Sequence, residues 1–244
     1  MNIHSSRIRE RLERVWPLVY LAVFGLLWLL GLALGNLVEA GRAVELNDLD
    51  HRVWRRIVQV RESYPGVTSL FVTITKAGDQ PWSSILVVAS MLGLAGLERK
   101  GIRPLGRWGF GYFLWAMIAS QVLTRLLKAH FARMRPDLLF RLVVEDSFSF
   151  PSGHSLTSAC FCGLWMWIAW RLVPPDRRYL RAVIPPLILL LALSIAASRV
   201  WLGVHYLNDV LSGLMLGFGW AGLSIGVHHG LSTATAEAET RSGT

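Results

Sequence analysis

Residues 16–38 have the sequence WPLVYLAVFGLLWLLGLALGNLV, a run without a single charged side chain. A helix that crosses a bilayer needs about 20 consecutive apolar residues, and this run is long enough. It follows a stretch with arginines at positions 7, 9, 11 and 14, as the apolar part of a signal peptide would. That part is usually only about 7–15 residues long, so we interpret the run as a retained first membrane helix.

Five further apolar runs follow along the chain, over residues 82–97, 109–127, 153–170, 183–197 and 205–227. The whole chain of 244 residues is 53% hydrophobic and only 17% charged, which excludes a disordered protein. Six spans leave no room for a separate soluble domain. We therefore expect an all-α protein, a six-span transmembrane helix bundle formed by one membrane-embedded domain over residues 1–231.

The longest polar connection, residues 39–80, contains a helical pattern of its own. Apolar residues recur there at a spacing of three to four, with arginines between them: Leu49, Val53, Ile57 and Val60 against Arg52, Arg55, Arg56 and Arg61. This pattern is typical of an amphipathic helix on the bilayer surface, an interfacial segment, and it fits equally well a small cap that packs on the other helices. The small, polar residues 232–244 are expected to form a disordered tail.

The net charge of +9 has two possible explanations, binding of nucleic acid or basic loops that flank membrane helices. The basic residues lie between the apolar runs and no nucleic-acid motif is present, so we expect no nucleic-acid partner. Basic residues in the shortest loops determine orientation most strongly, which predicts that both termini are cytoplasmic. Cys160 and Cys162 lie two residues apart within one apolar run and are expected to be apolar filler.

Polar residues collect where the last four runs begin or end: Lys128 and Arg135 after the third, Ser152 and His154 at the start of the fourth, Arg199 at the end of the fifth, and His205 and Asp209 at the start of the sixth. In an alternating topology all of these ends emerge on the same face of the membrane. Each cation or histidine alone would be explained as an interfacial residue or a lipid-headgroup contact. Their joint occurrence on one face instead predicts a functional site.

The residue types at this face point to phosphate chemistry. Three cations suit a phosphate dianion, and Ser152 is a good N-cap for a helix whose free N–H groups favour an anion. Gly153 lets the backbone approach closely. His205 and Asp209 are four residues apart, so the carboxylate can accept the Nδ1 proton and leave Nε2 as a nucleophile. His154 is then available as a general acid.

Three stretches of the chain resemble, in order and in spacing, the three signatures of the type 2 phosphatidic acid phosphatase superfamily. The stretches are Lys128, six residues, then Arg135-Pro136; Pro151-Ser152-Gly153-His154; and Ser198-Arg199, five residues, His205, three residues, Asp209. They cover about residues 128–209, and one motif alone would be weak, but the complete set is specific.

The resemblance implies a role for each matching position. His205 would attack phosphorus and form a phosphohistidine, Asp209 would support it, and His154 would protonate the leaving oxygen and then activate water. The phosphoryl oxygens would be held by Lys128, Arg135, Ser152, Gly153 and Arg199. The resemblance implies no metal and no other cofactor, a catalytic core over residues 109–227, and an active site near the outer, periplasmic surface of the membrane.

We therefore expect an integral membrane phosphatase whose partners are a lipid phosphate substrate and the surrounding membrane lipids. Undecaprenyl pyrophosphate, phosphatidylglycerophosphate, phosphatidic acid and lipid A phosphate present similar groups, and the sequence selects neither among them nor an oligomeric state. Two alternatives stay open. Vanadium-dependent haloperoxidases share the signatures but are soluble, and a non-enzymatic lipid carrier would use the same cations to bind a headgroup.

Two further features are interpreted structurally. Gly213 and Gly217 are four residues apart in the sixth run, a spacing that favours close packing of helices in membranes. His130 lies between residues of the first signature, but the proposed chemistry already has an acid and a nucleophile. We expect it to lie outside the reaction.

Overall fold

The computed structural model describes the backbone of residues 3–39, 44–104 and 109–242, and the side chains of residues 18–19, 21–37, 47–104 and 109–229. Within these ranges the chain forms eight α-helices, two short 3-10 helices and no strand, which confirms the all-α prediction.

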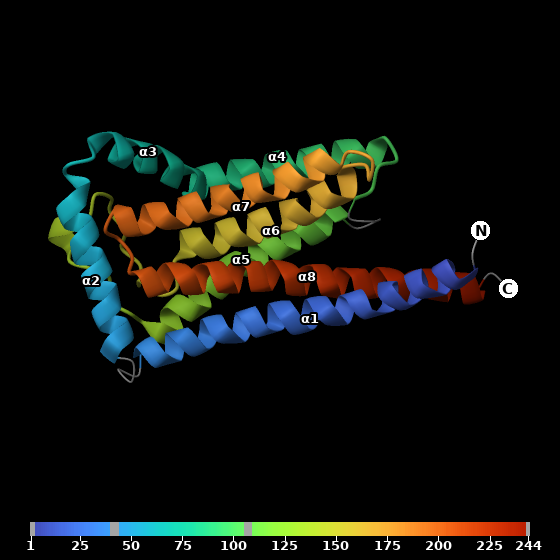
Figure 1. The fold of residues 1–244 in the computed structure, drawn as a ribbon, viewed down its shortest axis with the longest axis horizontal. Coiled ribbons are helices and arrows are strands. Elements are labelled where there is room, and N and C mark those ends of the chain that lie inside the picture. Colours follow the sequence, from blue (N-terminus) through green and yellow to red (C-terminus); the bar gives the residue numbers. More distant parts are fainter. Residues whose placement is uncertain (1–2, 40–43, 105–108, 243–244) are drawn as a thin grey trace.

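Six long helices lie side by side along the longest axis of the molecule (Figure 1). They are α1 (Ile3–Glu39), α4 (Gln80–Arg99), α5 (Gly109–Phe131), α6 (Gly153–Leu172), α7 (Arg178–Trp201) and α8 (Leu207–Ser242). Two shorter helices, α2 (Val44–Arg61) and α3 (Pro65–Thr75), connect α1 to the bundle, and the 3-10 helix η1 (Lys76–Gly78) leads into α4. Figure 1 shows α2 across one end of the bundle and both chain termini at the other end.

Helix α6 is the central element, since it packs against α5, α7 and α8. Its residues Cys160, Leu164 and Ile168 are almost fully buried in a core that also takes Phe113 from α5 and Ala221 from α8. Helix α1 packs along α8 on the other side. This arrangement fixes the starts of α6 and α8 relative to each other, and the predicted site residues lie there.

The outward faces of the bundle are apolar. On α4 and α7, side chains such as Leu92, Leu187 and Leu190 are more than half exposed, which suits helices surrounded by lipid rather than water. Four helices of the described chain are long and apolar enough to cross a membrane: α4, α5, α7 and residues 207–229 of α8. The protein is therefore a helical membrane protein.

The predicted count of six spans is not confirmed by length and hydropathy. The first half of α6 carries His154, Ser155, Thr157 and Ser158, and these polar residues lower its mean hydropathy. They point into the protein, because α6 is enclosed by other helices. In α1, the apolar stretch within the described side chains is limited to Leu21–Leu37. Hydropathy depends on composition alone, so it does not take into account that the surroundings of α1 and α6 differ.

Helix α2 is amphipathic, as the spacing of its apolar residues predicted. Val53 and Ile57 pack against a cluster formed by α7 and α8, while Arg52, Arg55 and Arg56 are exposed. Arg61 departs from the prediction, because it is buried and its Nη2 donates to the carbonyl oxygen of Phe140 at 2.6 Å. Of the two readings left open by the sequence, the contacts support a cap on the ends of α7 and α8.

Helix α8 continues to Ser242, where the sequence suggested a disordered tail from residue 232. The physical reason is local composition: residues 234–238 alternate alanine with threonine and glutamate, and no glycine or proline interrupts residues 231–242. Alanine and glutamate are strong helix formers, so polarity alone was a poor guide to disorder here.

Candidate active site

The helix ends that carry the predicted site residues lie at the end of the bundle where α2 lies (Figure 1). Four of them come from helix ends: Lys128 from the last turn of α5, Ser152 from the N-cap of α6, Arg199 from the last turn of α7 and Asp209 from the first turn of α8. His205 lies in the turn between α7 and α8. The structure thus brings these helix ends together.

The hydrogen bonds of His205 define which ring nitrogen carries the proton. Its Nε2 lies 3.0 Å from Nη1 of Arg135. A guanidinium only donates hydrogen bonds, so Nε2 accepts and holds a lone pair, and the proton is on Nδ1. Nδ1 faces the Oδ2 atom of Asp209 at 3.4 Å, and the hydroxyl of Ser149 at the same distance. This is the tautomer that a nucleophilic Nε2 requires.

Asp209 is fully buried and held from several directions. The hydroxyl of Ser149 and the backbone N–H of Tyr206 both donate to its Oδ2 atom, and Arg133 forms an ion pair with Oδ1. Arg133 is itself paired with buried Asp50 from α2 at 2.7 Å. A buried charge needs such partners, and together they fix the carboxylate against His205.

Burial and the neighbouring cations hold the pKa of His205 well below its usual range. Burial is the largest cause, and the positive charges of Arg135, Lys128 and Arg199, with His154, lower the pKa further. Both effects disfavour a charged imidazole. His205 is therefore neutral at physiological pH, with its lone pair directed at the cations rather than at a proton.

The start of α6 is shaped for a small anion. Ser152 caps the helix, since its hydroxyl accepts from the N–H of Ser155 at 3.4 Å, and its own N–H donates to the carbonyl oxygen of Asp209 at 3.0 Å. A Cβ added to Gly153 would lie 3.2 Å from Thr124 and 3.8 Å from Cε of Lys128. Glycine at this position thus lets the helix start lie close to Thr124 of α5.

The three predicted phosphate-binding cations are held by protein oxygens. Lys128 donates to the carbonyl oxygen of Phe148, and Arg199 donates to Thr75 Oγ1 at 2.7 Å. Glu145 forms ion pairs with both Arg199 and Arg135. Its carboxylate therefore lies between the two guanidinium groups, where the charges suit a phosphate dianion. Arg199 Nε is buried without a hydrogen-bond partner among the described residues.

His154 makes a contact that the sequence did not predict. Its Nε2 lies 2.8 Å from Oδ1 of Asp79, the residue before α4. The hydrogen bond from His154 holds the pKa of Asp79 below its usual range, so this carboxyl is ionised at neutral pH. The site therefore contains two histidine–carboxylate pairs, one for each predicted catalytic histidine.

Five residues that contact the site were missed by the sequence analysis: Thr75, Asp79, Arg133, Glu145 and Ser149. Arg133 and Ser149 lie within two residues of matched positions, so their polarity was a usable signal. Thr75 and Asp79 come from the 39–80 connection, and no spacing relates them to the motifs. His130 is exposed and packs edge-on against Phe131, with ring centroids 4.8 Å apart.

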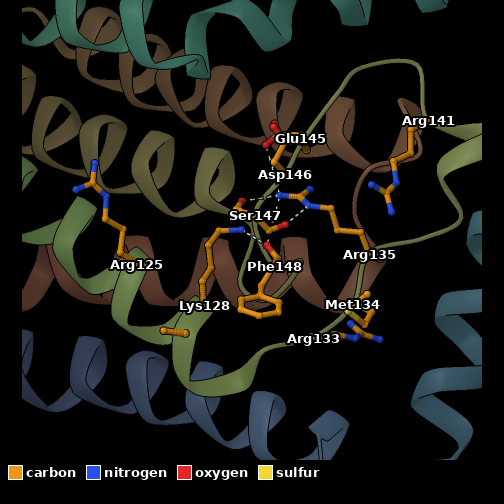
Figure 2. A pocket seen from close by; sticks show the side chains of 11 residues that line it. Arg125, Lys128, Arg133, Met134, Arg135, Arg141, Glu145, Asp146, Ser147 and Phe148 are labelled. Carbon is orange, nitrogen blue, oxygen red and sulfur yellow. Dashed lines mark hydrogen bonds and ion pairs between the residues drawn. The ribbon is translucent and has the colours of Figure 1, made fainter.

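A cavity of about 430 Å³ opens beside these residues, between α5 and the segment 133–148. Figure 2 shows Lys128 and Arg135 directed toward the backbone of residues 147–148, with Arg125 one turn earlier on α5. The charged residues that line the cavity are Arg125, Lys128, Arg133, Arg135, Arg141, Glu145 and Asp146. The excess of positive charge suits an anionic headgroup, and Phe148 and Met134 add apolar surface.

Comparisons with known proteins agree with this geometry. Residues 109–232 match the family model of the PAP2 superfamily. The chain is 31% identical to phosphatidylglycerophosphatase B of Bacillus subtilis over 57% of this chain and 71% of that protein. It is also 31% identical to a lipid A 1-phosphatase of Rhizobium etli, over 68% and 73% of the two chains.

A solved structure extends the likeness to most of the fold. The crystal structure of a transmembrane PAP2-type phosphatidylglycerolphosphate phosphatase from Bacillus subtilis superposes with a TM-score of 0.71 at 29% identity, covering 84% of this chain and 94% of that one. The matched region contains every residue of the two histidine–carboxylate pairs except Asp79, which precedes residue 109. The chain belongs to the PAP2 superfamily.

Proposed function

We propose that this protein is a membrane-embedded phosphatase that removes the terminal phosphate from a lipid phosphate or pyrophosphate. The observation that carries the proposal is the state of His205, a neutral imidazole with Nε2 beside Arg135 and Nδ1 beside Asp209. A neutral imidazole among fixed cations can attack phosphorus while the cations bind the phosphoryl oxygens, as phosphoryl transfer requires. A headgroup carrier would need the cations but not the two histidine–carboxylate pairs.

In the first step the lone pair of His205 Nε2 attacks phosphorus, and the bond from phosphorus to the lipid oxygen breaks. The electron pair of that bond stays on the lipid oxygen, which takes a proton from His154. Lys128, Arg135 and Arg199 bind the phosphoryl oxygens, as does the start of α6 at Ser152 and Gly153 (Gly153 through its backbone alone). Asp209 stabilises the positive charge that develops on His205.

In the second step water attacks the phosphohistidine. His154, now neutral, takes a proton from the water, and the bond between phosphorus and Nε2 breaks, returning its electron pair to His205. Inorganic phosphate then leaves. The fixed cations take over the charge neutralisation that Mg²⁺ supplies in kinases and nucleotide hydrolases, so the reaction proceeds without added metal.

All six long helices span the membrane, with both termini in the cytoplasm and the active site at the outer surface. Helix α6 has 20 residues, about the length that crosses a hydrocarbon core, and its polar side chains are shielded by neighbouring helices. Figure 1 shows α2, beside the site, and the chain termini at opposite ends of the bundle, so cytoplasmic termini place the site at the outer surface. The helix ends and loops near the termini include Arg99, Lys100, Arg177 and Arg178, as expected for the cytoplasmic side.

The substrate class is a lipid with a phosphate monoester or pyrophosphate at the membrane surface. The names of the relatives support phosphatidylglycerophosphate and lipid A 1-phosphate as substrates. The cavity of about 430 Å³ opens where such a headgroup would arrive, and Arg125 lies one helical turn from Lys128. A second phosphate on the same lipid would therefore find a cation beside the reacting one.

The test is phosphate release by the purified protein from four lipids: phosphatidylglycerophosphate, phosphatidic acid, undecaprenyl pyrophosphate and lipid A phosphate. We expect release from at least one of them, unchanged by EDTA, and none from the His205→Ala variant. The Asp209→Asn variant should keep substrate binding but lose about 10²- to 10⁴-fold in kcat. Turnover by the folded His205→Ala variant would contradict the mechanism.

A further inference from the structure

We infer that Asp79, which the superfamily signatures do not include, is the positioning residue of the general acid, holding His154 so that its Nδ1 atom faces the leaving oxygen. The inference rests on the proposed function. Asp79 Oδ1 lies 2.8 Å from Nε2 of His154, within hydrogen-bonding distance. Since the carboxylate only accepts, the Nε2 proton stays between the two groups, and Nδ1 is the nitrogen left to exchange protons with substrate and water.

The side chain of Asp79 does not make the hydrogen bond that its position at the start of α4 would favour. It is the N-cap residue of α4, where an aspartate usually accepts a hydrogen bond from the first turn of its own helix. Its side chain makes no such bond. A missing cap costs about 1 kcal/mol, so the carboxylate is directed to His154 at the expense of helix stability. This favours a role in the site over a role in α4.

The neighbouring residue closes the space around the imidazole. A Cβ added to Gly78 would lie 2.5 Å from Cδ2 of His154 and 3.2 Å from Ile195. Only glycine lets the backbone of η1 approach the ring this closely. Asp79 thus holds one edge of the ring through a hydrogen bond, and the backbone at Gly78 blocks its rotation.

The two histidine–carboxylate pairs differ in the number of cations that act on the imidazole and in the distance to the carboxylate. Burial and, after it, three cations keep the imidazole of His205 neutral. His154 lies closer to its carboxylate, with Nε2 at 2.8 Å from Asp79 compared with 3.4 Å between His205 and Asp209, and this contact favours its imidazolium form at the moment of proton transfer. In the first step the imidazolium gives the Nδ1 proton to the leaving oxygen. In the second step the neutral ring takes a proton from water at the same atom.

The experiment compares two substrates that differ in their need for an acid. Phosphatidic acid loses a lipid alkoxide, which must be protonated, whereas p-nitrophenyl phosphate loses a stabilised phenolate. The quantity measured is kcat/KM, because it reports only the steps through formation of the phosphohistidine. For Asp79→Asn we expect a loss of about 10- to 100-fold on phosphatidic acid and of less than about threefold on the aryl phosphate. Asp79→Glu should recover part of the loss.

Two further variants separate positioning from damage to the fold. Because Asp79 acts through His154, the double variant Asp79→Asn/His154→Ala should be no slower than His154→Ala alone. Asp176→Asn changes an exposed aspartate between α6 and α7 and should leave both substrates unaffected. Equal losses on the two substrates, additive losses in the double variant, or no loss would overturn the inference. Loss of all turnover in His205→Ala checks the proposed function separately.

Discussion

His205 combines a nearby set of positive charges with an unprotonated ring, and the charges favour the unprotonated form. Burial and the cations lower its pKa well below the ordinary value, so they keep the nucleophile ready at neutral pH. The same cations bind the phosphoryl group. A single set of charges therefore serves substrate binding and nucleophile activation.

This arrangement predicts a pH shift when one cation is removed. Arg135 is the first charged group among those that lower the pKa of His205. Its loss makes protonation easier, so the pKa rises, and activity that needs the neutral ring declines at a higher pH. For Arg135→Gln we expect the acidic limb of kcat/KM on p-nitrophenyl phosphate to move up by about one pH unit.

The matched control for this shift is Arg141→Gln. Arg141 lines the same cavity, but it donates to the carbonyl oxygen of Pro136 and is not among the main charges that lower the pKa of His205. In the Arg141→Gln variant the acidic limb of kcat/KM should stay at the wild-type pH. A limb that moves equally in both variants, or in neither, would contradict the assignment.

The position of Glu145 leads to a second prediction, about the affinity of the site for phosphate. Its carboxylate is paired with Arg199 and Arg135, so an incoming phosphate must displace it. A partly exposed ion pair is worth up to about 1 kcal/mol, and Glu145→Gln should therefore lower the inhibition constant of inorganic phosphate by about fivefold. Asp146→Asn, in the same cavity, is the control and should leave it unchanged. An unchanged or weaker affinity in Glu145→Gln would argue that the carboxylate does not compete with phosphate.

The sequence predicted the matched residues correctly because their spacing places them at the ends of consecutive helices. Thr75, Asp79 and Glu145 could not be found this way. They reach the site from connecting segments, and the path of a connection depends on how the helices pack rather than on a periodic pattern.

At the scale of elements, glycines set the distance between α6, which carries His154, and α8, which begins two residues after His205. Gly213 and Gly217 of α8 face α6: a Cβ on Gly213 would lie 2.7 Å from the carbonyl oxygen of Ser152, and one on Gly217 would collide with that of Leu156. The spacing of these glycines predicted close packing, and the structure confirms it. On its other side α8 uses Gly219 and Gly222 against α1.

Gly217→Ala should therefore destabilise the bundle and displace the start of α6 from His205. We expect a loss of about 1–3 kcal/mol in stability, measured as a lower Tm in detergent, together with reduced turnover. Gly93→Ala in α4 is the control, since no heavy atom lies within 4 Å of an added Cβ. It should be neutral or stabilising by up to about 1 kcal/mol. Equal Tm values for the two variants would contradict the account that Gly217 sets the distance between α8 and α6.

Amphipathic α2 illustrates what periodicity can and cannot predict. Its apolar face followed from the spacing of Val53 and Ile57, but the surface that covers this face did not. The partner comes from α7 and α8, more than a hundred residues later in the chain. Asp50, on the same helix, reaches Arg133 and so connects the cap to Asp209.

At the scale of the whole molecule, the site and the chain termini occupy opposite ends of the bundle (Figure 1). Sequence hydropathy located all six long helices but could not show which of them face lipid. Helix α6 is nearly enclosed and tolerates serine, threonine and histidine, whereas α7 exposes leucines along much of its length. The distinction depends on three-dimensional neighbours.

The orientation predicts which loops react with a membrane-impermeant maleimide in intact cells. Leu139 is 86% exposed at the site end, and the side chain of Asp176 is 77% exposed at the end with the termini. Leu139→Cys should be labelled from outside and Asp176→Cys only after the membrane is permeabilised. The native cysteines are buried, so they give little background. Labelling of Asp176→Cys from outside, with Leu139→Cys labelled only after permeabilisation, would contradict the proposed topology.

The most direct measurement is to trap the phosphoryl group on the enzyme. The His154→Ala variant lacks the group that activates water, yet p-nitrophenyl phosphate needs no acid to leave, so the intermediate should accumulate. After an alkaline quench, mass spectrometry should locate the phosphoryl group on His205, and the same peptide from a His205→Ala/His154→Ala variant should carry none. A phosphoryl group on another residue, or sustained turnover by His154→Ala with no modified residue, would contradict the account.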